Sequence, residues 1–128
     1  MVKKKMKYLR LEDLNAYQIA SELSDYVWKI VIKWDWFTKK TVGSQWVEST
    51  DSIAGNIAEG FGRYHKRDKQ KFYYNARGSV YESAHWTKKV YQRGLISKEE
   101  NSHIIIELRK LPKEINSLVS FTEKRLTI

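Results

Sequence analysis

The spacing of apolar residues is the feature that most constrains this chain. Along four long segments these residues recur at alternating steps of three and four, which places them on one face of an α-helix. The segments run from about residue 12 to 36, 41 to 61, 69 to 93 and 98 to 125. One proline and six glycines in 128 residues are too few for many short strands, which need a turn about every 8 to 12 residues. The pattern therefore predicts an all-α fold.

Each segment supplies one face of a predicted core. In the first two segments the positions are Leu14, Tyr17, Ala20, Leu23, Val27, Ile30, Trp34, Trp46, Thr50, Ile53, Ile57 and Phe61. In the last two they are Phe72, Ala76, Ser79, Ser83, Trp86, Val90, Ile104, Leu108, Leu111, Ile115, Leu118 and Thr122. Four helices, each about 30 to 40 Å long and joined by short loops, predict an antiparallel up-down-up-down four-helix bundle. We expect a basic N-terminal tail over residues 1–10 and one bundle domain over residues 11–128.

Several helix ends are visible in the sequence. Ser97 and Glu100 form the pattern of a capping box, in which the side chain of each residue accepts a hydrogen bond from the backbone N–H of the other. Gly94 has the position of a glycine that ends a helix, and Asp68 that of an N-cap. Pro112 lies within the last segment, where it removes one hydrogen bond. We expect a kink there, with the apolar face continuing through it.

Composition excludes several classes of protein. The chain has no cysteine, which excludes disulfides, thiolate metal sites and a cysteine nucleophile and favours a cytoplasmic location. It has no apolar run approaching the about 18 residues that span a bilayer, and its basic start lacks the apolar stretch of a signal peptide. We therefore expect neither a membrane span nor a membrane partner.

A motif runs from residue 52 to residue 82, SIAGNIAEGFGRYHKRDKQKFYYNARGSVYE. It resembles the four-helix-bundle family encoded by open reading frames within intervening sequences of bacterial 23S ribosomal RNA genes. The matching positions are Ser52, Ile53, Asn56, Ile57, Ala58, Glu59, Gly60, Gly62, Arg63, Phe72, Ala76, Gly78, Ser79 and Glu82. The resemblance implies a homo-oligomer, typically a pentameric ring, without established enzymatic activity. A distantly similar group, the accessory proteins of diversity-generating retroelements, implies nucleic-acid or reverse-transcriptase partners.

The polar residues of the motif form two rows at helical spacing. They are Ser52, Asn56, Glu59 and Arg63 on the second segment, and Asn75, Ser79 and Glu82 on the third. If the rows face each other, hydrogen bonds between them fix the register of the two helices. The alternatives are an acid–base pair of Glu59 and Glu82, or contact with a partner. Gly60 is placed at a helix end, and Gly78, in mid-helix, predicts a close approach of another helix.

Positive charge is concentrated between residues 63 and 77. The chain has 24 Lys and Arg against 15 Asp and Glu, a formal net charge of +9. The predicted nucleic-acid-binding residues are Arg63, Lys66, Arg67, Lys69, Lys71 and Arg77. Tyrosines and Phe72 lie among them, and Lys69 and Lys71 are placed in the first turn of a helix, where cations are unfavourable for stability. The alternatives are a solvated loop, and for Arg63 an ion pair with Glu59 one turn back.

Two kinds of catalytic site are weighed and not favoured. Glu82 and His85 form one Glu-x-x-His step, whereas a di-iron bundle needs two such steps and two further glutamates. The spacings from Arg63 to His65 and from Arg77 to His85 differ from the Arg-x4-His and Arg-x6-His patterns of helical RNA nucleases. We therefore expect no metal, no cofactor and no enzymatic activity.

Several aromatic residues fall off the predicted core faces. They are Tyr26, Trp28, Trp36 and Tyr91. Exposed aromatic side chains mark contact surfaces, although wider core faces would also explain them. The sequence therefore predicts a non-enzymatic homo-oligomer, with five copies as the resemblance implies, that binds RNA or DNA through a basic surface. The alternatives are a protein-binding scaffold without nucleic-acid binding, and an all-helical RNA nuclease.

Overall fold

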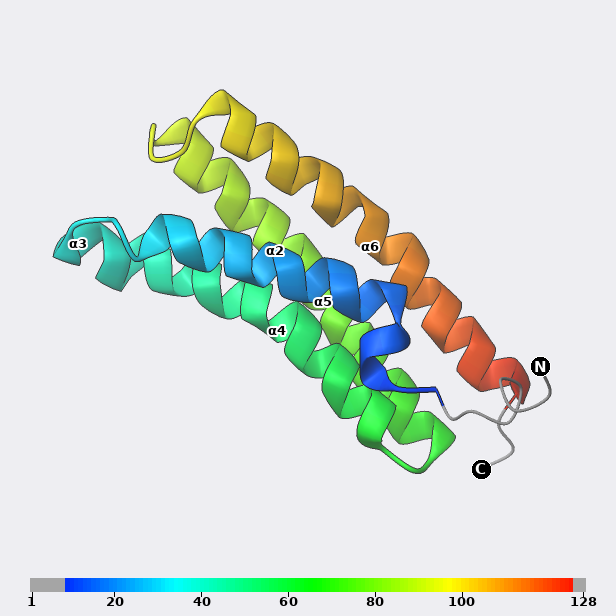
Figure 1. Cartoon of the computed structure of the whole chain (residues 1–128). Helices are drawn as coiled ribbons and strands as arrows, with labels where there is room; N and C mark the ends of the chain where they lie inside the picture. Colours follow the sequence, from blue (N-terminus) through cyan, green and yellow to red (C-terminus); the bar gives the residue numbers. More distant parts are fainter. Residues whose placement is uncertain (1–8, 126–128) are drawn as a thin grey trace.

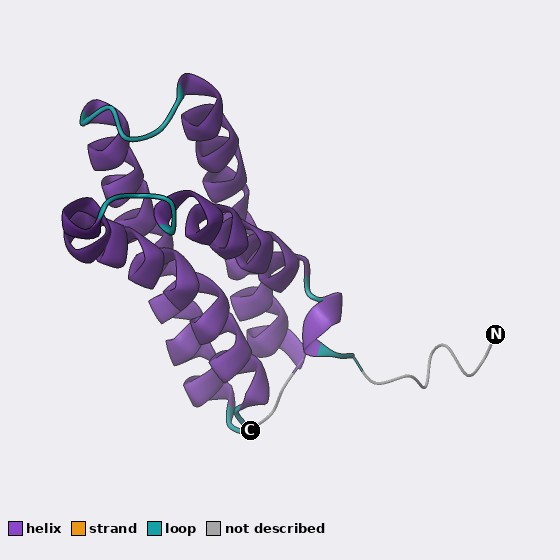
Figure 2. Cartoon of the chain, turned by 60° about the vertical axis from the view of Figure 1, so that its left-hand side comes forward, coloured by secondary structure: helices purple, strands orange, loops and turns teal. Residues whose placement is uncertain are grey.

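The computed structural model describes residues 9–125, and its long elements are four α-helices (Figure 1). They are α2 (Asn15–Val31), α4 (Ser44–Gly62), α5 (Lys66–Gln92) and α6 (Lys98–Arg125). The chain reverses direction at each connection between them (Figure 1), and residues 9–125 contain no strand (Figure 2). The four-helix bundle is therefore confirmed. The residues of the predicted tail before Leu9, including its lysines, lie outside the described residues.

The helices surround one core. α4 packs against α5, α5 against α6, and α2 against both α4 and α6. The largest fully buried apolar side chains are Trp46, Leu23, Ile53, Ile57, Ile104, Leu111 and Ile115, all on the predicted faces. Other predicted core residues pack half-buried around them, namely Tyr17, Ile30, Trp34, Phe61 and Leu118. No helix in residues 9–125 is both long and apolar enough to cross a bilayer.

Half of the predicted core face of α5 is displaced by one residue, whereas Ala76, Ser83 and Val90 are buried as predicted. The positions that are only half-buried are Phe72, Ser79 and Trp86. In each case the next residue is buried instead: Tyr73, Val80 and Thr87. At the last of these three pairs, the buried Thr87 supplies an acceptor 2.9 Å from the indole Nε1 of Trp46, the largest core side chain. A buried indole N–H needs such a partner, and Trp86 could not provide one.

The first connection differs from the prediction. α2 ends at Val31, whereas the sequence predicted a helix to Trp36. Asp35 caps a new helix, because its Oδ1 accepts a hydrogen bond of 3.0 Å from the backbone N–H of Thr38. This helix, α3 (Trp36–Thr38), continues through a π-helical turn, Lys39–Gly43, into α4. Asp35 is one of the residue types preferred at an N-cap, which is the sequence signal for this helix start.

The last connection is as predicted. Gly94 has a φ of 73°, and the N–H of Leu95 donates to the carbonyl of Val90 across it, as in a Schellman motif. Ser97 N–H donates to Glu100 Oε1 at 2.8 Å, and Glu100 N–H to Ser97 Oγ at 3.0 Å. The capping box is therefore confirmed.

Two further helix predictions have mixed outcomes. α6 is continuous through Pro112, and its buried face continues to Ile115 and beyond as expected. The start of α5 was wrong: the helix begins at Lys66 after His65, so Asp68 lies inside its first turn and is not the N-cap. The reason is that the N–H of Lys69 donates to the carbonyl of His65, which closes a helical turn before Asp68 could act as a cap.

Candidate functional site

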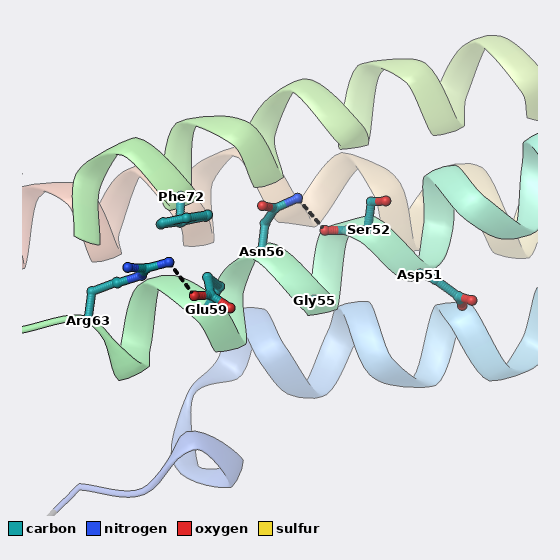
Figure 3. A pocket seen from close by; sticks show the side chains of 7 residues that line it. All are labelled: Asp51, Ser52, Gly55, Asn56, Glu59, Arg63 and Phe72. Carbon is teal, nitrogen blue, oxygen red and sulfur yellow. Dashed lines mark hydrogen bonds and ion pairs between the residues drawn. The ribbon is translucent and has the colours of Figure 1, made fainter. Parts of the chain in front are cut away.

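The motif residues of α4 lie around a shallow groove between α4 and α5 (Figure 3). The groove is lined by Asp51, Ser52, Gly55, Asn56, Glu59, Arg63 and Phe72. Ser52 and Asn56 are half-buried, whereas Glu59 and Arg63 are exposed. The polar row predicted on this helix is therefore brought together, at the surface of the bundle.

The two polar rows do not bind each other. Asn56 Nδ2 donates to the carbonyl of Ser52 at 2.9 Å, within α4. Glu82 Oε2 accepts from the indole of Trp86 at 3.3 Å, within α5. In residues 9–125 no hydrogen bond joins the row on α4 to the row on α5, so the predicted cross-bundle register bonds were wrong. The physical reason is spacing: partners four residues apart on one helix are already in reach.

The predicted ion pair between Arg63 and Glu59 is present, with 2.6 Å between Arg63 Nη2 and Glu59 Oε2. The Arg63 guanidinium also lies over the ring of Phe72 on α5, 4.7 Å from its centroid. The contact between the motif residues of the two helices is therefore a cation–π contact. Both partners of the ion pair are exposed, so the pair orients Arg63 more than it stabilises the fold.

The close helix approach predicted at Gly78 occurs at Gly60 instead. A Cβ built on Gly60 would lie 2.7 Å from the ring of Tyr73 and 3.0 Å from the carbonyl oxygen of Lys69. A Cβ on Gly78 would meet no heavy atom of residues 9–125 within 4 Å. Gly78 is exposed because it lies opposite the buried face of α5. Burial beneath the α4–α5 turn also raises the pKa of Tyr73 to about 12.

Lys69 has a structural role that the sequence did not reveal. Its Nζ donates to the carbonyls of Phe61, at 2.8 Å, and Gly60, at 3.4 Å. These carbonyls end α4, so Lys69 caps that helix from α5. Burial lowers the pKa of Lys69. The inference that stability does not explain this lysine was therefore wrong.

The other predicted cations divide into two groups. Lys66 pairs with Glu123, with 3.6 Å between Nζ and Oε2. Arg77 donates to Asn116 Oδ1 at 2.8 Å. Arg67 and Lys71 are exposed and make no hydrogen bond or ion pair within residues 9–125. The structure therefore leaves these two cations available to a ligand.

The histidines of the alternative catalytic sites lie apart. His65 precedes α5, with its ring at right angles to that of Tyr64. His85 is exposed on α5 beside Trp86. Within residues 9–125 no three side chains of His, Asp or Glu are grouped as metal ligands.

Four exposed apolar side chains belong to the end of α2 and to α3, the part of the bundle that lies away from the α4–α5 turn (Figure 1). Trp36 and Phe37 are 70% and 68% exposed, and Trp28 on α2 and Ile32, just after α2, are also exposed. Of the other residues placed off the core, Tyr91 is exposed, whereas Tyr26 is half-buried against the ring of His103. We call Trp28, Ile32, Trp36 and Phe37 the apolar end.

Sequence reasoning missed the outward face of α5. Tyr74 and Tyr81 are 47% and 64% exposed, although they belong to a helix of the core. Their spacing to Lys71 and Gly78 alternates between three and four, the same signal that identified the buried faces. Apolar residues at this periodicity indicate the buried face of a helix, whereas cations and tyrosines at the same periodicity mark the outward face of α5.

Comparison with known proteins agrees with this architecture. The family model described as 23S rRNA-intervening sequence protein matches residues 12–117. A search of curated proteins found no match. A crystal structure of a protein of unknown function from the S23 ribosomal protein family of Bacteroides thetaiotaomicron is similar, with a TM-score of 0.72 and 16% sequence identity over 81% of this chain and 97% of that one. At that identity the likeness shows the fold, and the match to the family model over most of the chain shows that this protein belongs to the 23S rRNA-intervening sequence protein family.

Proposed function

We propose that this protein is a non-enzymatic, self-assembling helical bundle of the cytoplasm that binds RNA, or another nucleic acid, through the basic surface of α5. The observation that carries the proposal is the exposure of Arg67 and Lys71, neither of which has a hydrogen-bond or ion-pair partner within residues 9–125. Phosphate groups are the anions that such free cations bind, and a net charge of +9 attracts polyanions from a distance. The family description mentions 23S rRNA, which makes RNA the first ligand to test.

The four partnered cations contribute differently. Arg63, Lys66, Lys69 and Arg77 are held by neighbours at the surface or under the α4–α5 turn. They add to the positive potential, but a phosphate would have to compete with an existing partner to bind them directly. Arg67 and Lys71 need no such exchange, so they are the primary contacts.

Self-association is the second part of the proposal. Large exposed apolar side chains are unfavourable in water unless a partner covers them. The apolar end presents four of them within residues 28–37. We propose that copies of the chain contact each other there, with five copies as the number that the family resemblance implies.

The test is a titration of fluorescent RNA with the full chain at two or more salt concentrations. Replacing Arg67 and Lys71 by Gln should weaken binding and reduce the slope of log affinity against log salt by about 1.4, since each contact with single strands contributes about 0.7. The matched control replaces Lys98 and Lys113, which are exposed on α6, by Gln and changes the charge equally. Binding that is flat with salt, or equally weakened in the control, would refute the proposed surface.

A protein-binding scaffold is the second candidate, because the apolar end suits a protein partner as well as a second copy. It predicts a partner that stays bound after nuclease treatment and in high salt. Nucleic-acid binding predicts the loss of any partner under both conditions.

A further inference from the structure

One face of α5 points directly away from the core. Its residues follow each other at steps of four and three, and all are exposed: Arg67, Lys71, Tyr74, Gly78, Tyr81, His85 and Lys88. We call this face the α5 track. We propose that the track binds a single strand of nucleic acid along the helix, with bases stacked on the tyrosines and phosphates on the cations. The inference rests on the proposed function, and adds the strandedness of the ligand and the path that it takes.

The tyrosines supply stacking surfaces. The ring of Tyr81 makes no hydrogen bond, ring or cation contact within residues 9–125. The ring of Tyr74 has the Arg77 guanidinium on one side, 4.9 Å from its centroid, and the guanidinium is itself held by Asn116. A ring fixed in this way loses little freedom when a base stacks on its open side. Every base has a flat face, so such stacking tolerates any sequence.

Gly78 lies midway between the two tyrosines. A glycine in mid-helix is less stable than alanine, and no contact within residues 9–125 requires it here. Without a side chain at this position, the surface between the rings is level with the helix backbone. A nucleotide can therefore approach the helix there more closely than any other residue would permit.

Charge selects the class of ligand. Arg67 and Lys71 lie at one end of the track and Lys88 lies near the other, and no carboxylate belongs to it. Glu82, beside the track, is engaged by the indole of Trp86. A second copy docked through the same face would bring cations against cations, whereas a nucleic-acid strand brings phosphates.

The exposed rings favour single strands over duplexes. In a duplex the flat faces of the bases are covered by their neighbours, so the tyrosines could not stack on them, and contact would be limited to phosphates, sugars and base edges in the grooves. In a single strand the bases can turn out and stack on aromatic rings. From Arg67 to Lys88 the track is about 32 Å long at 1.5 Å per residue, enough for several nucleotides.

The test compares two labelled probes, a 12-nucleotide oligouridine and a hairpin duplex with the same number of phosphates, by fluorescence anisotropy with the full chain. Tyr81→Ala should weaken oligouridine binding about tenfold, in line with the value of one stacked base, and duplex binding less than twofold. Tyr91→Ala is the control, because Tyr91 is an exposed tyrosine of the same helix that lies off the track.

A second variant tests the open surface. Gly78→Leu should keep or raise the melting temperature but weaken oligouridine binding at least fivefold, because the side chain occupies the space of the nucleotide. Ser120→Leu is its control, because Ser120 is a small, exposed residue of α6 that lies off the track.

The outcomes separate the two proposals. If R67Q/K71Q weakens binding while Tyr81→Ala and Gly78→Leu leave it unchanged, the basic surface stands and the track is refuted. If none of these variants affects binding, both proposals are refuted. If Tyr81→Ala or Gly78→Leu lowers the solution mass of the assembly, the face is a contact between copies, which also overturns the track.

Discussion

The absence of a single Cβ atom determines how closely α4 and α5 pack. The missing Cβ of Gly60 lets the ring of Tyr73 lie against the backbone of α4, while the missing Cβ of Gly78 leaves only open surface. Both glycines belong to the same motif, and the sequence predicted the close approach at Gly78. The rotation of each helix about its axis decides which glycine faces a neighbour, and for α5 this rotation depends on contacts with α4 and α6.

The two glycines should respond oppositely to alanine. Gly60→Ala should lower the free energy of unfolding by about 1 to 3 kcal/mol, because the methyl group forces Tyr73 or the helix backbone to move. Gly78→Ala should raise it by about 0.5 to 1 kcal/mol, because alanine is the better helix former. Urea unfolding followed by circular dichroism measures both. Equal effects of the two substitutions would contradict the close contact at Gly60.

The buried indole of Trp46 makes a similar prediction. Thr87→Val removes the hydroxyl that accepts its N–H and should cost about 1 to 3 kcal/mol, since the donor is left unpaired in the core. Thr87→Ser should retain the acceptor and most of the stability. Thr122→Val is the control, because the buried Thr122 hydroxyl donates only to a carbonyl of its own helix. A cost no larger than that of the control would refute the bond.

At the scale of elements, sequence reasoning was limited by what periodicity can measure. It identified the buried faces of α2, α4 and α6 because each offers one continuous apolar row. On α5 two adjacent rows of residues, one through Trp86 and one through Thr87, could each form the buried face. The row through Thr87 is buried because its hydroxyl accepts a hydrogen bond from Trp46, forty-one residues away in the sequence. The candidate cations were likewise identified from the local concentration of positive charge. Lys69 was predicted to bind a ligand, because its contact with the end of α4 is a tertiary contact that the sequence does not reveal.

The cap that begins α3 should make stability depend on pH. The backbone N–H of Thr38, and then its hydroxyl, hold the pKa of Asp35 below the ordinary value of 3.8. Because the folded-state pKa is lowered, this contribution is present above about pH 4 and is lost as the pH falls through the folded-state pKa. Asp35→Ala should therefore be less stable than the wild type at pH 7, and the difference should shrink towards pH 2.

Thermal unfolding of both proteins across this pH range measures the effect. Asp25→Ala is the control, since Asp25 is exposed in the middle of α2 and caps no helix. A difference between Asp35→Ala and wild type that stays constant with pH would contradict the role of the carboxylate.

At the scale of the whole molecule, the proposed assembly depends on the apolar end. The wild-type chain should have a solution mass several times its 15.2 kDa, near fivefold if the ring implied by the resemblance forms. Replacing Trp36 and Phe37 by Ser should lower this mass without unfolding the bundle, because both side chains are largely exposed in the single chain. Light scattering after size-exclusion chromatography measures the change, with Phe121→Ser as the control, because Phe121 is an exposed aromatic residue of α6 outside the apolar end. A wild-type mass of a single chain would refute assembly.

The apolar end and Arg67 lie at opposite tips of the long helices, the first beside α3 and the second just after the α4–α5 turn (Figure 1). A helix of 27 residues, about 40 Å long, separates the two. Copies in contact at the apolar end would therefore leave Arg67 and Lys71, at the other tip, accessible to a ligand. Copies in contact at the first tip would each present the charged tip of α5 outward. A strand bound to one copy would be held at a high effective concentration near the next, so several weak contacts would give a higher overall affinity.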